Sequence, residues 1–224
     1  GTVIYDNTKP WVTHASIQNG LAADDPGSAQ LYRDVWVKPI VYDEVKYEGD
    51  HTKRWAQLSG VELVHRFWAC TVAGTYAGHS EYFQNEGDVV WLGQGGTIQG
   101  ESPERIGFLR KILEDSPARG IEPIDKWQDP RMGGVPGQYY LMYFGYEAPT
   151  SWPFELSRRG VVEGMEFSVE IIDTWNMTIT PAERIAPIIP HPTRHGAVVR
   201  GGKPDAAFGV NLPGRPYLAI RCRG

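Results

Sequence analysis

Two adjacent carboxylates, Asp43 and Glu44, directly follow a short apolar run from Ile40 to Tyr42. Strands of a parallel sheet are buried on both faces and read as such unbroken runs, and in barrel folds their carboxyl ends open onto the active site. A glutamate in that position can attack, or exchange a proton with, a glycosidic bond, so the pattern points to sugar chemistry. The alternative is that both residues are only the solvated end of a strand.

The N-terminal half alternates strand and helix patterns, which predicts a parallel α/β arrangement. Helices are expected where apolar residues recur at helical spacing, with Ser28 and Ser102 placed to cap two of them. Three strand-plus-helix units are too few to close an eight-unit barrel of roughly 250 residues, so we expect either a small α/β domain or part of a larger one. The expected strands are residues 12–17, 40–42 and 75–78, and the expected helices are residues 28–37, 59–73 and 104–114.

The C-terminal half has a different character, because Pro and Gly punctuate segments rich in β-branched and aromatic residues. This pattern predicts an antiparallel β-sandwich, so the fold class is α/β plus all-β, with domains at residues 1–115 and 116–224. The expected strands include residues 138–144, 166–172, 175–179 and 217–221. Residues 116–137 are the expected linker and first strand, and residues 187–192 and 201–204 are expected turns or extended loops.

The composition limits the partners. With a formal net charge of -5, and with Lys and Arg scattered, there is no general electrostatic case for nucleic acid. The 8 Trp and 11 Tyr exceed what a core needs, and exposed aromatic faces over a cleft stack on sugar rings. Structural Trp in a sandwich core would give the same count. No long apolar run or signal-peptide pattern is present, so we expect a soluble chain without a membrane partner, in an undetermined compartment.

Metal or disulfide chemistry is not predicted. Cys70 and Cys222 are far apart and belong to no Cys-x-x-Cys pattern. His191 and His195 are four residues apart, but Pro190 and Pro192 argue against the helix that such a spacing would require. We therefore expect no cofactor.

Five segments stand out: Lys9–His14, Lys38–Glu44, Gly78–Glu81, Gly95–Arg110 and Trp175–Thr178. Taken together, they resemble the C-terminal half of the apiosidase-like retaining (β/α)8-barrel glycoside hydrolases, whose barrel is followed by a small β-sandwich. The resemblance covers nearly the whole chain. It implies that the three expected strands are the sixth, seventh and eighth of a barrel, with the N-terminal portion of the barrel as partner and a glycoside, oligosaccharide or polysaccharide as substrate.

The resemblance also implies residue roles. The nucleophile of this clan is a Glu at the end of strand seven, which corresponds to Glu44, whereas the acid/base comes from strand four and has no counterpart here. The chain is therefore expected to be part of a longer polypeptide and to have little activity alone. The third strand end departs from the family pattern, because it reads His79-Ser80-Glu81 where a Gly is expected before the Glu.

Residues at strand ends and in nearby loops are candidates for substrate binding, although each could equally hold a loop in place. Asp43 is expected to orient or hydrogen-bond rather than to be a second catalyst, because adjacent strand residues point to opposite faces. Glu48 and Asp50 are expected to face solvent. The substrate-binding candidates are His14, Asp43, Trp55, His79, Glu81 and Trp91.

A second function class remains open: a noncatalytic carbohydrate-binding protein whose aromatic loops hold glycan without an acid/base. In a third interpretation the sandwich only stabilises the barrel. The sugar, the linkage and the choice between exo and endo action depend on loops of all eight strands, most of which are not in this chain.

Overall fold

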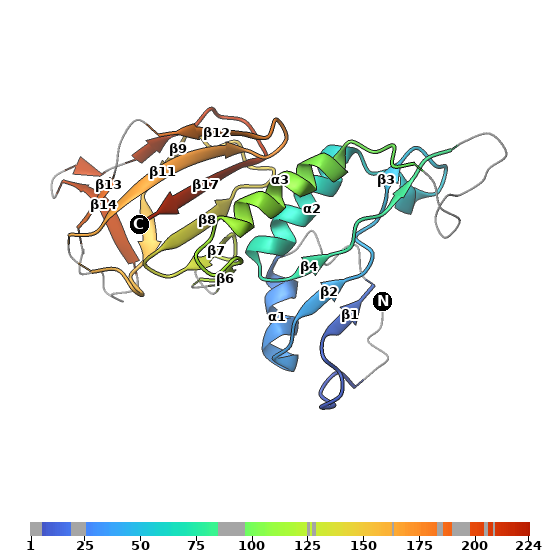
Figure 1. The fold of residues 1–224 in the computed structure, drawn as a ribbon. Coiled ribbons are helices and arrows are strands. Elements are labelled where there is room, and N and C mark those ends of the chain that lie inside the picture. The colour runs from blue at the N-terminus through green and yellow to red at the C-terminus, as the bar shows by residue number, and fades with distance from the viewer. Residues whose placement is uncertain are drawn as a thin grey trace. The chain divides into compact units, whose positions relative to one another are not determined.

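The structure is a computed structural model that describes residues 6–18, 26–84, 97–124, 126, 129–162, 164–182, 186–189, 198–203, 206–207 and 209–224. The chain divides into two compact units, Gly1–Arg110 and Lys111–Gly224. The boundary falls within helix α3 (Ser102–Glu114), five residues before the expected domain boundary at 115. Figure 1 labels the helices and strands of both units.

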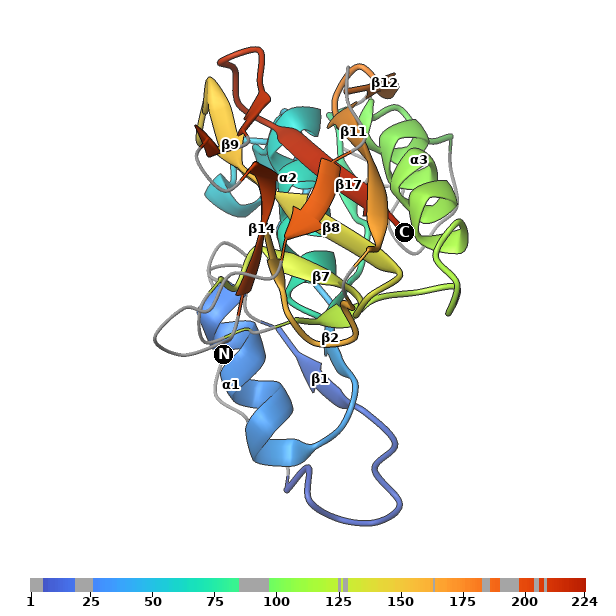
Figure 2. The same cartoon turned by 90° about the vertical axis from the view of Figure 1, so that its left-hand side faces the viewer.

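The first unit contains a three-stranded parallel sheet in the order β1-β2-β4. Helix α1 (Pro26–Trp36) connects β1 to β2 and lies beside these strands in Figures 1 and 2. Helix α2 (Gly60–Val72) follows β2 and precedes β4. The predicted alternation of strand and helix is confirmed at this level. Among the described residues the sheet has three strands and is not a closed barrel. The strands are β1 (Ala15–Ile17), β2 (Ile40–Tyr42) and β4 (Tyr76–Ala77).

Local chemistry explains where α2 begins. The Ser59 hydroxyl accepts the Glu62 N–H at 3.3 Å and the Glu62 carboxylate accepts the Ser59 N–H at 2.9 Å, a reciprocal capping box. Trp68 and Leu63 on this helix are fully buried. Apolar burial and the cap together therefore stabilise the helix that follows the candidate carboxylates.

A second, shorter parallel pair joins β3 (Glu48–Gly49) to β5 (Glu81–Tyr82), with Glu48 directly opposite Glu81. Glycine is required at position 49, because a Cβ there would lie 1.9 Å from the Tyr82 carbonyl oxygen. A 3₁₀ turn, η2 (Arg54–Ala56), follows β3. This pair sets the register of the segments that carry most candidate site residues.

The second unit is antiparallel. Hydrogen bonds connect its main sheet in the order β10-β14-β13-β11-β17-β8-β7-β6, with β12 paired to β11 and β15 paired to β14, while β9 pairs separately with β16. The strands are β6 (Glu122–Pro123), β7 (Met132–Val135), β8 (Tyr139–Tyr143), β9 (Ser151–Pro153), β10 (Glu155–Ser157), β11 (Glu166–Asp173), β12 (Thr178–Pro181), β13 (Ala186–Ile189), β14 (Val198–Lys203), β15 (Ala206–Ala207), β16 (Gly209–Asn211) and β17 (Leu218–Arg223).

The core of this unit shows how the sheet buries its apolar face. Leu156 of β10 and Val199 of β14 belong to the same cluster as Met132 of β7 and Met142 of β8, although these pairs lie near opposite ends of the hydrogen-bonded path. The sheet therefore curls around one core. The predicted antiparallel character is confirmed. The predicted sandwich would have two separate sheets packed face to face, whereas the described residues of this unit form one curled sheet and the separate β9–β16 pair.

One predicted strand and two predicted loops of this unit differ from the structure. Residues 174–177 form a turn, because the Asp173 carboxylate accepts the N–H groups of Trp175 at 3.1 Å and Asn176 at 2.8 Å, and Met177 has a φ of 54°. The predicted loops at 187–192 and 201–204 contain parts of strands β13 and β14. Pairing of these strands with each other and with β10 and β11 overrides their local turn propensity.

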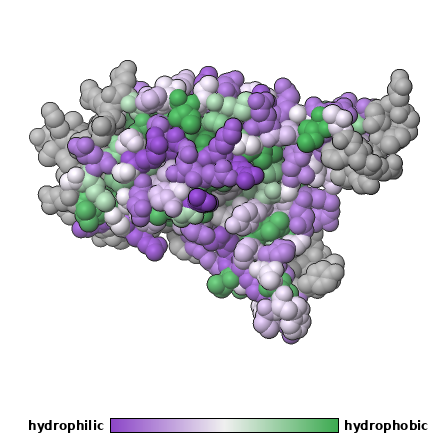
Figure 3. Space-filling model, in the orientation of Figure 1, coloured by the Kyte–Doolittle hydropathy of each residue, from purple (hydrophilic) through white to green (hydrophobic). Residues whose placement is uncertain are grey.

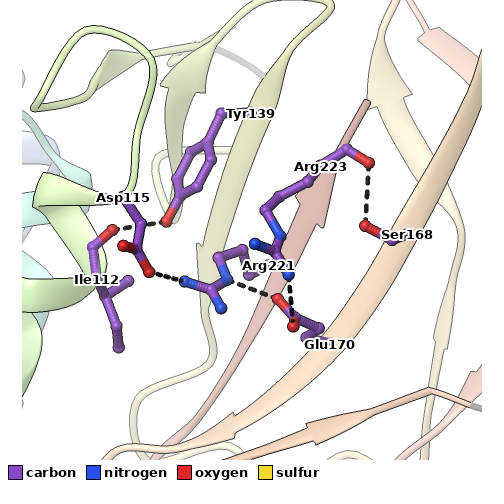
Figure 4. Close-up of polar contacts among 7 residues, drawn as sticks. All are labelled: Ile112, Asp115, Tyr139, Ser168, Glu170, Arg221 and Arg223. Carbon is purple, nitrogen blue, oxygen red and sulfur yellow. Dashed lines mark hydrogen bonds and ion pairs between the residues drawn. The ribbon is translucent and has the colours of Figure 1, made fainter.

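The end of α3 in the second unit is held by buried polar contacts (Figure 4). The Tyr139 hydroxyl donates to the Ile112 carbonyl at 2.9 Å. Arg221, 3% exposed, binds Glu170 at 2.7 Å and Asp115 at 3.0 Å. Glu170 also binds Arg223 at 2.8 Å. These ion pairs lie on the face of β17 opposite to Ile220 and Cys222 of the core.

The face of the molecule drawn in Figure 3 is mainly polar. On the face drawn in Figure 3, the described side chains are mostly hydrophilic and the apolar ones form small separate patches. None of the helices in the described ranges has both the length and the apolar character that crossing a membrane requires.

Candidate active site

The carboxyl ends of the three parallel strands meet at one edge. The Asp43 N–H donates to the Ile17 carbonyl at 3.1 Å, and the Gly78 N–H donates to the Tyr42 carbonyl at 2.8 Å. Gly78 is required here, because a Cβ would lie 2.4 Å from the Asp43 carbonyl oxygen. The strand ends are therefore close enough for their following residues to share a site.

Asp43 is exposed and accepts a hydrogen bond from the hydroxyl of Ser16 on β1. Its carboxylate thus bridges the first two strands of the sheet. This contact agrees with an orienting role better than with a reacting one.

Glu44 is half-buried and lies beside the phenol of Tyr47. Burial raises the pKa of Tyr47, the charge of Glu44 and its acceptance of the phenol hydrogen raise that pKa further, and a hydrogen bond from Ser80 opposes the rise. Between them, Lys46 has a φ of 69°, a left-handed conformation that is uncommon for a residue with a Cβ. Such backbone conformations concentrate at functional sites.

An aromatic cluster surrounds Tyr47. The Trp55 ring packs edge-on to Tyr47 at 5.1 Å and to Tyr82 at 5.5 Å, and His51 packs against Tyr82 at 4.3 Å between ring centroids. Trp55 is 44% exposed, whereas Tyr47 is only 7% exposed. The cluster therefore presents a partly exposed indole, held in place by its neighbours, next to the residue that contacts Glu44.

Glu48 and Glu81 are both buried. Glu81 accepts the N–H groups of Gln99 and Gly100, both at 2.8 Å, and Glu48 accepts those of Glu101 at 2.7 Å and Ser102 at 3.1 Å. The four carboxylate oxygens thus bind four consecutive N–H groups at the start of α3. This is a structural clamp, and the expectation that Glu48 faces solvent is wrong.

His79 is half-buried, with its Nε2 3.2 Å from the Ser102 hydroxyl oxygen. Its ring nitrogen and the carboxylates of Glu48 and Glu81 lie within 4.8 Å of one another, a grouping that could hold a metal ion. The carboxylates already accept backbone N–H groups at the positive end of a helix, which disfavours a cation. Ser102, predicted as a cap, donates its hydroxyl to Glu48, so Glu48 supplies the acceptor at this helix start.

One of the predicted site residues lies elsewhere. His14 is exposed just before β1, at the opposite end of that strand from Asp43, and its Nδ1 lies 3.1 Å from the Thr13 hydroxyl oxygen. Trp91 lies outside the described residues. Glu44, Asp43 and Gly78 are thus brought to one edge, Trp55 is linked to it through Tyr47, and His14 is not brought to it.

Sequence reasoning did not identify Tyr47 or Tyr82 as parts of this site. The only available signal was that both aromatic residues follow an expected strand end within a few positions. Tyr82 lies beside Trp55 because β3 pairs with β5, which joins residues more than thirty positions apart, whereas Tyr47 is held there by its N–H bond to the Trp55 carbonyl at 3.0 Å.

Comparisons with known proteins agree with a glycoside hydrolase-like fold. A family model described as a domain of unknown function, DUF5605, matches residues 127–223. No curated protein matches the chain. A candidate glycoside hydrolase from Bacteroides vulgatus is 29% identical with a TM-score of 0.87, and the match covers 98% of this chain and 42% of that one.

A second solved structure, described as a glycoside hydrolase, is 10% identical with a TM-score of 0.63, over 99% of this chain and 55% of that one. At this identity the likeness concerns the fold alone. This chain therefore spans about half or less of the length of both proteins, and its fold is that of part of a glycoside hydrolase-like protein.

Proposed function

We propose that this chain is part of a retaining O-glycoside hydrolase in which Glu44 is the nucleophile. The observation that carries the proposal is the position of Glu44, which lies two residues beyond the carboxyl end of β2 and three residues before Tyr47, whose ring packs against the partly exposed Trp55. The similarity to the B. vulgatus protein supports the same activity class. The neighbouring carboxylates have other partners: Asp43 binds Ser16, and Glu48 and Glu81 bind backbone N–H groups.

In this reaction the Glu44 carboxylate attacks the anomeric carbon while a second carboxyl group, about 5–5.5 Å away, protonates the leaving oxygen. Water then hydrolyses the glycosyl–enzyme ester, with the second group acting as base. We place that second group on sequence outside this chain, in the N-terminal portion of an apiosidase-like (β/α)8 barrel. Strands β1, β2 and β4 would be its last three, and the antiparallel unit would be its appended C-terminal domain.

The test is hydrolysis of a panel of aryl glycosides by the protein made from its full gene, with and without Glu44→Gln. The matched control is Glu104→Gln, which removes an exposed carboxylate on α3. We expect the Glu44 variant to lose at least about a thousandfold in kcat, and the control to keep full activity. Full activity in the Glu44 variant would eliminate this nucleophile. Equal turnover by the 224-residue chain alone would refute the external acid/base.

A noncatalytic carbohydrate-binding function is the second candidate, and the exposed ring of Trp55 favours it. It predicts that glycans quench tryptophan fluorescence in the wild type and not in Trp55→Ala, while the full-length protein turns over no glycoside.

A further inference from the structure

We propose that His51 is a sugar-binding residue, whose Nε2–H group donates a hydrogen bond to a hydroxyl of the sugar ring that stacks on Trp55. The two side chains would form one subsite for a neutral glycoside with hydroxyl groups around the rim of its ring. That this ring belongs to the substrate of Glu44 rests on the proposed function, but the binding of a glycoside to His51 and Trp55 does not.

Trp55 is restrained on several sides and still partly exposed. Among the described residues, three rings contact its indole, with ring centroids 5.1 Å away for Tyr47, 5.5 Å for Tyr82 and 6.1 Å for His51. A side chain that only anchors a loop is expected to be buried, as Tyr47 is at 7% exposure, whereas Trp55 is 44% exposed. An indole that is already fixed loses little conformational entropy when a sugar ring stacks on it.

Backbone hydrogen bonds fix His51 and Trp55 in the same turn. The His51 N–H donates to the Ala56 carbonyl at 3.2 Å, and the Trp55 carbonyl accepts the Tyr47 N–H at 3.0 Å. Within the turn, the Ala56 N–H donates to the Lys53 carbonyl at 2.8 Å. The separation of the imidazole and the indole is therefore set by the protein before a ligand binds.

Tyr82 of β5 supports both rings from a second segment of the chain. Its ring is edge-on to each of them, with centroids 4.3 Å from His51 at 63° between the planes and 5.5 Å from Trp55 at 87°. In the parallel pairing of β3 with β5, Tyr82 lies opposite Gly49, two residues before His51. This strand pairing therefore holds the imidazole and the indole against one shared ring.

A hydrogen bond at Nδ1 decides which nitrogen of His51 carries the proton. The Lys53 N–H donates to Nδ1 at 3.1 Å. A ring nitrogen that accepts a hydrogen bond carries no proton, so the proton of the imidazole is on Nε2. Within the described part of the chain, no hydrogen bond occupies this Nε2–H group. The imidazole therefore keeps one donor for a ligand.

The direction of this donor suits a sugar ring that lies on the indole. The planes of His51 and Trp55 are 27° apart, so the Nε2–H bond, which lies in the imidazole plane, is within 27° of the indole plane. The hydroxyl groups of a sugar project from the rim of its ring, whereas its apolar C–H groups face an aromatic surface. A donor that meets the rim favours a sugar with a hydroxyl there over the deoxy analogue, which leaves the donor unpaired.

The test uses two substitutions of His51 that differ in reach. His51→Asn keeps an acceptor for the Lys53 N–H and removes the distal donor, whereas His51→Gln extends an NH₂ group toward the position of Nε2. Both are made in the full-length protein with Glu44→Gln, so that the ligand is not consumed. Calorimetric titration with methyl glycosides of common pentoses and hexoses measures each Kd. For the glycoside that binds best, we expect binding about three- to tenfold weaker in His51→Asn, and within about twofold of the parent protein in His51→Gln.

Removal of the hydroxyl from the sugar should have the same effect as removal of the donor. One singly deoxygenated form of the best glycoside should bind equally to the parent protein and to His51→Asn, because the same hydrogen bond cannot be lost twice. Trp55→Ala should abolish measurable binding. Trp11→Ala is the matched control, because it removes an indole that is 74% exposed elsewhere in the first unit, and it should leave Kd unchanged.

Equal Kd values for the parent protein and His51→Asn, or equal weakening by both substitutions of His51, would overturn the donor role. A weakening in His51→Asn that persists with every deoxygenated form would overturn it too, and so would a parent protein that binds no glycoside of the panel. Failure of the proposed function gives a different result: the wild type then turns over no aryl glycoside, while the Kd differences among the His51 variants remain.

Discussion

Glu48 and Glu81 lie opposite each other in the β3–β5 pair, and their carboxylates together accept the N–H groups of residues 99–102. Two carboxylates this close repel each other unless positive partners compensate. Consecutive N–H groups at a helix start provide that compensation, since the helix dipole is positive there. The clamp fixes the segment leading into α3 against the strands that flank the candidate active site.

Gly100 lies between the two carboxylates, so replacement by Ala should disrupt the clamp. Its Cβ would lie 2.4 Å from one Glu48 oxygen and 2.7 Å from one Glu81 oxygen. We expect Gly100→Ala to lower the free energy of unfolding by about 2 kcal/mol. Gly107→Ala is the control, because its Cβ meets nothing within 4 Å and should stabilise α3 by about 0.5–1 kcal/mol. Urea unfolding measures both, and equal stability of the two variants would contradict the clamp.

Glu81→Gln tests whether Glu81 is structural or a sugar ligand. An amide keeps one acceptor but turns an NH₂ group toward a backbone N–H, so we expect a loss of about 2–3 kcal/mol in unfolding free energy. Amide hydrogen exchange at Gln99 and Gly100 should accelerate at the same time. Glu104→Gln, on the exposed face of α3, should change stability by less than about 0.5 kcal/mol. A Glu81 variant with native stability and a raised KM would instead support the sugar-ligand hypothesis.

His65 should make the chain acid-sensitive. Burial lowers its pKa to about 4 from the ordinary value of 6.5, with the charge of Arg66 adding to the shift and Glu62 opposing it. The unfolded chain therefore binds more protons between these two pH values, so stability falls as the pH drops through this window. The loss reaches about 3 kcal/mol near pH 4.

The measurement for His65 is the slope of unfolding free energy between pH 7 and pH 4. His65→Gln should have a shallower slope than the wild type, whatever its stability at neutral pH. His14→Gln, at an exposed position, should have the wild-type slope. Parallel slopes for all three proteins would disprove a buried neutral His65.

Arg221 should be more sensitive to substitution than the exposed Arg200 of the same unit. It is buried between Glu170 and Asp115 (Figure 4), so Arg221→Met leaves Glu170 largely buried with only Arg223 as its ionic partner among these contacts. We expect a loss of about 3 kcal/mol, measured by urea unfolding with hydrogen exchange on β17. Arg200→Met breaks the exposed pair with Glu155 and should cost about 0–1 kcal/mol. A smaller loss for Arg221 than for Arg200 would be incompatible with this network.

Local sequence patterns were enough to predict the strand and helix units of the first half and the place of Glu44 at a strand end. Apolar runs such as Ile40–Tyr42 and the Ser59 capping signal are local, and local patterns suffice where propensity and burial agree. The antiparallel character of the second half was also readable, because β-branched and aromatic segments between Gly and Pro have few other solutions.

Only the tertiary structure decided what surrounds Glu44 and what buries Glu48. The segment around Glu48 reads locally as a polar loop, but its partners are backbone N–H groups more than fifty residues away at the start of α3. Likewise, the chain after Tyr47 lies alongside Ser80 because the Glu48 N–H donates to the Ser80 carbonyl at 3.2 Å at the start of the β3–β5 pair. Hydrogen bonds to distant backbone groups leave no periodic trace in a sequence, so burial and pairing, not propensity, set the roles of these residues.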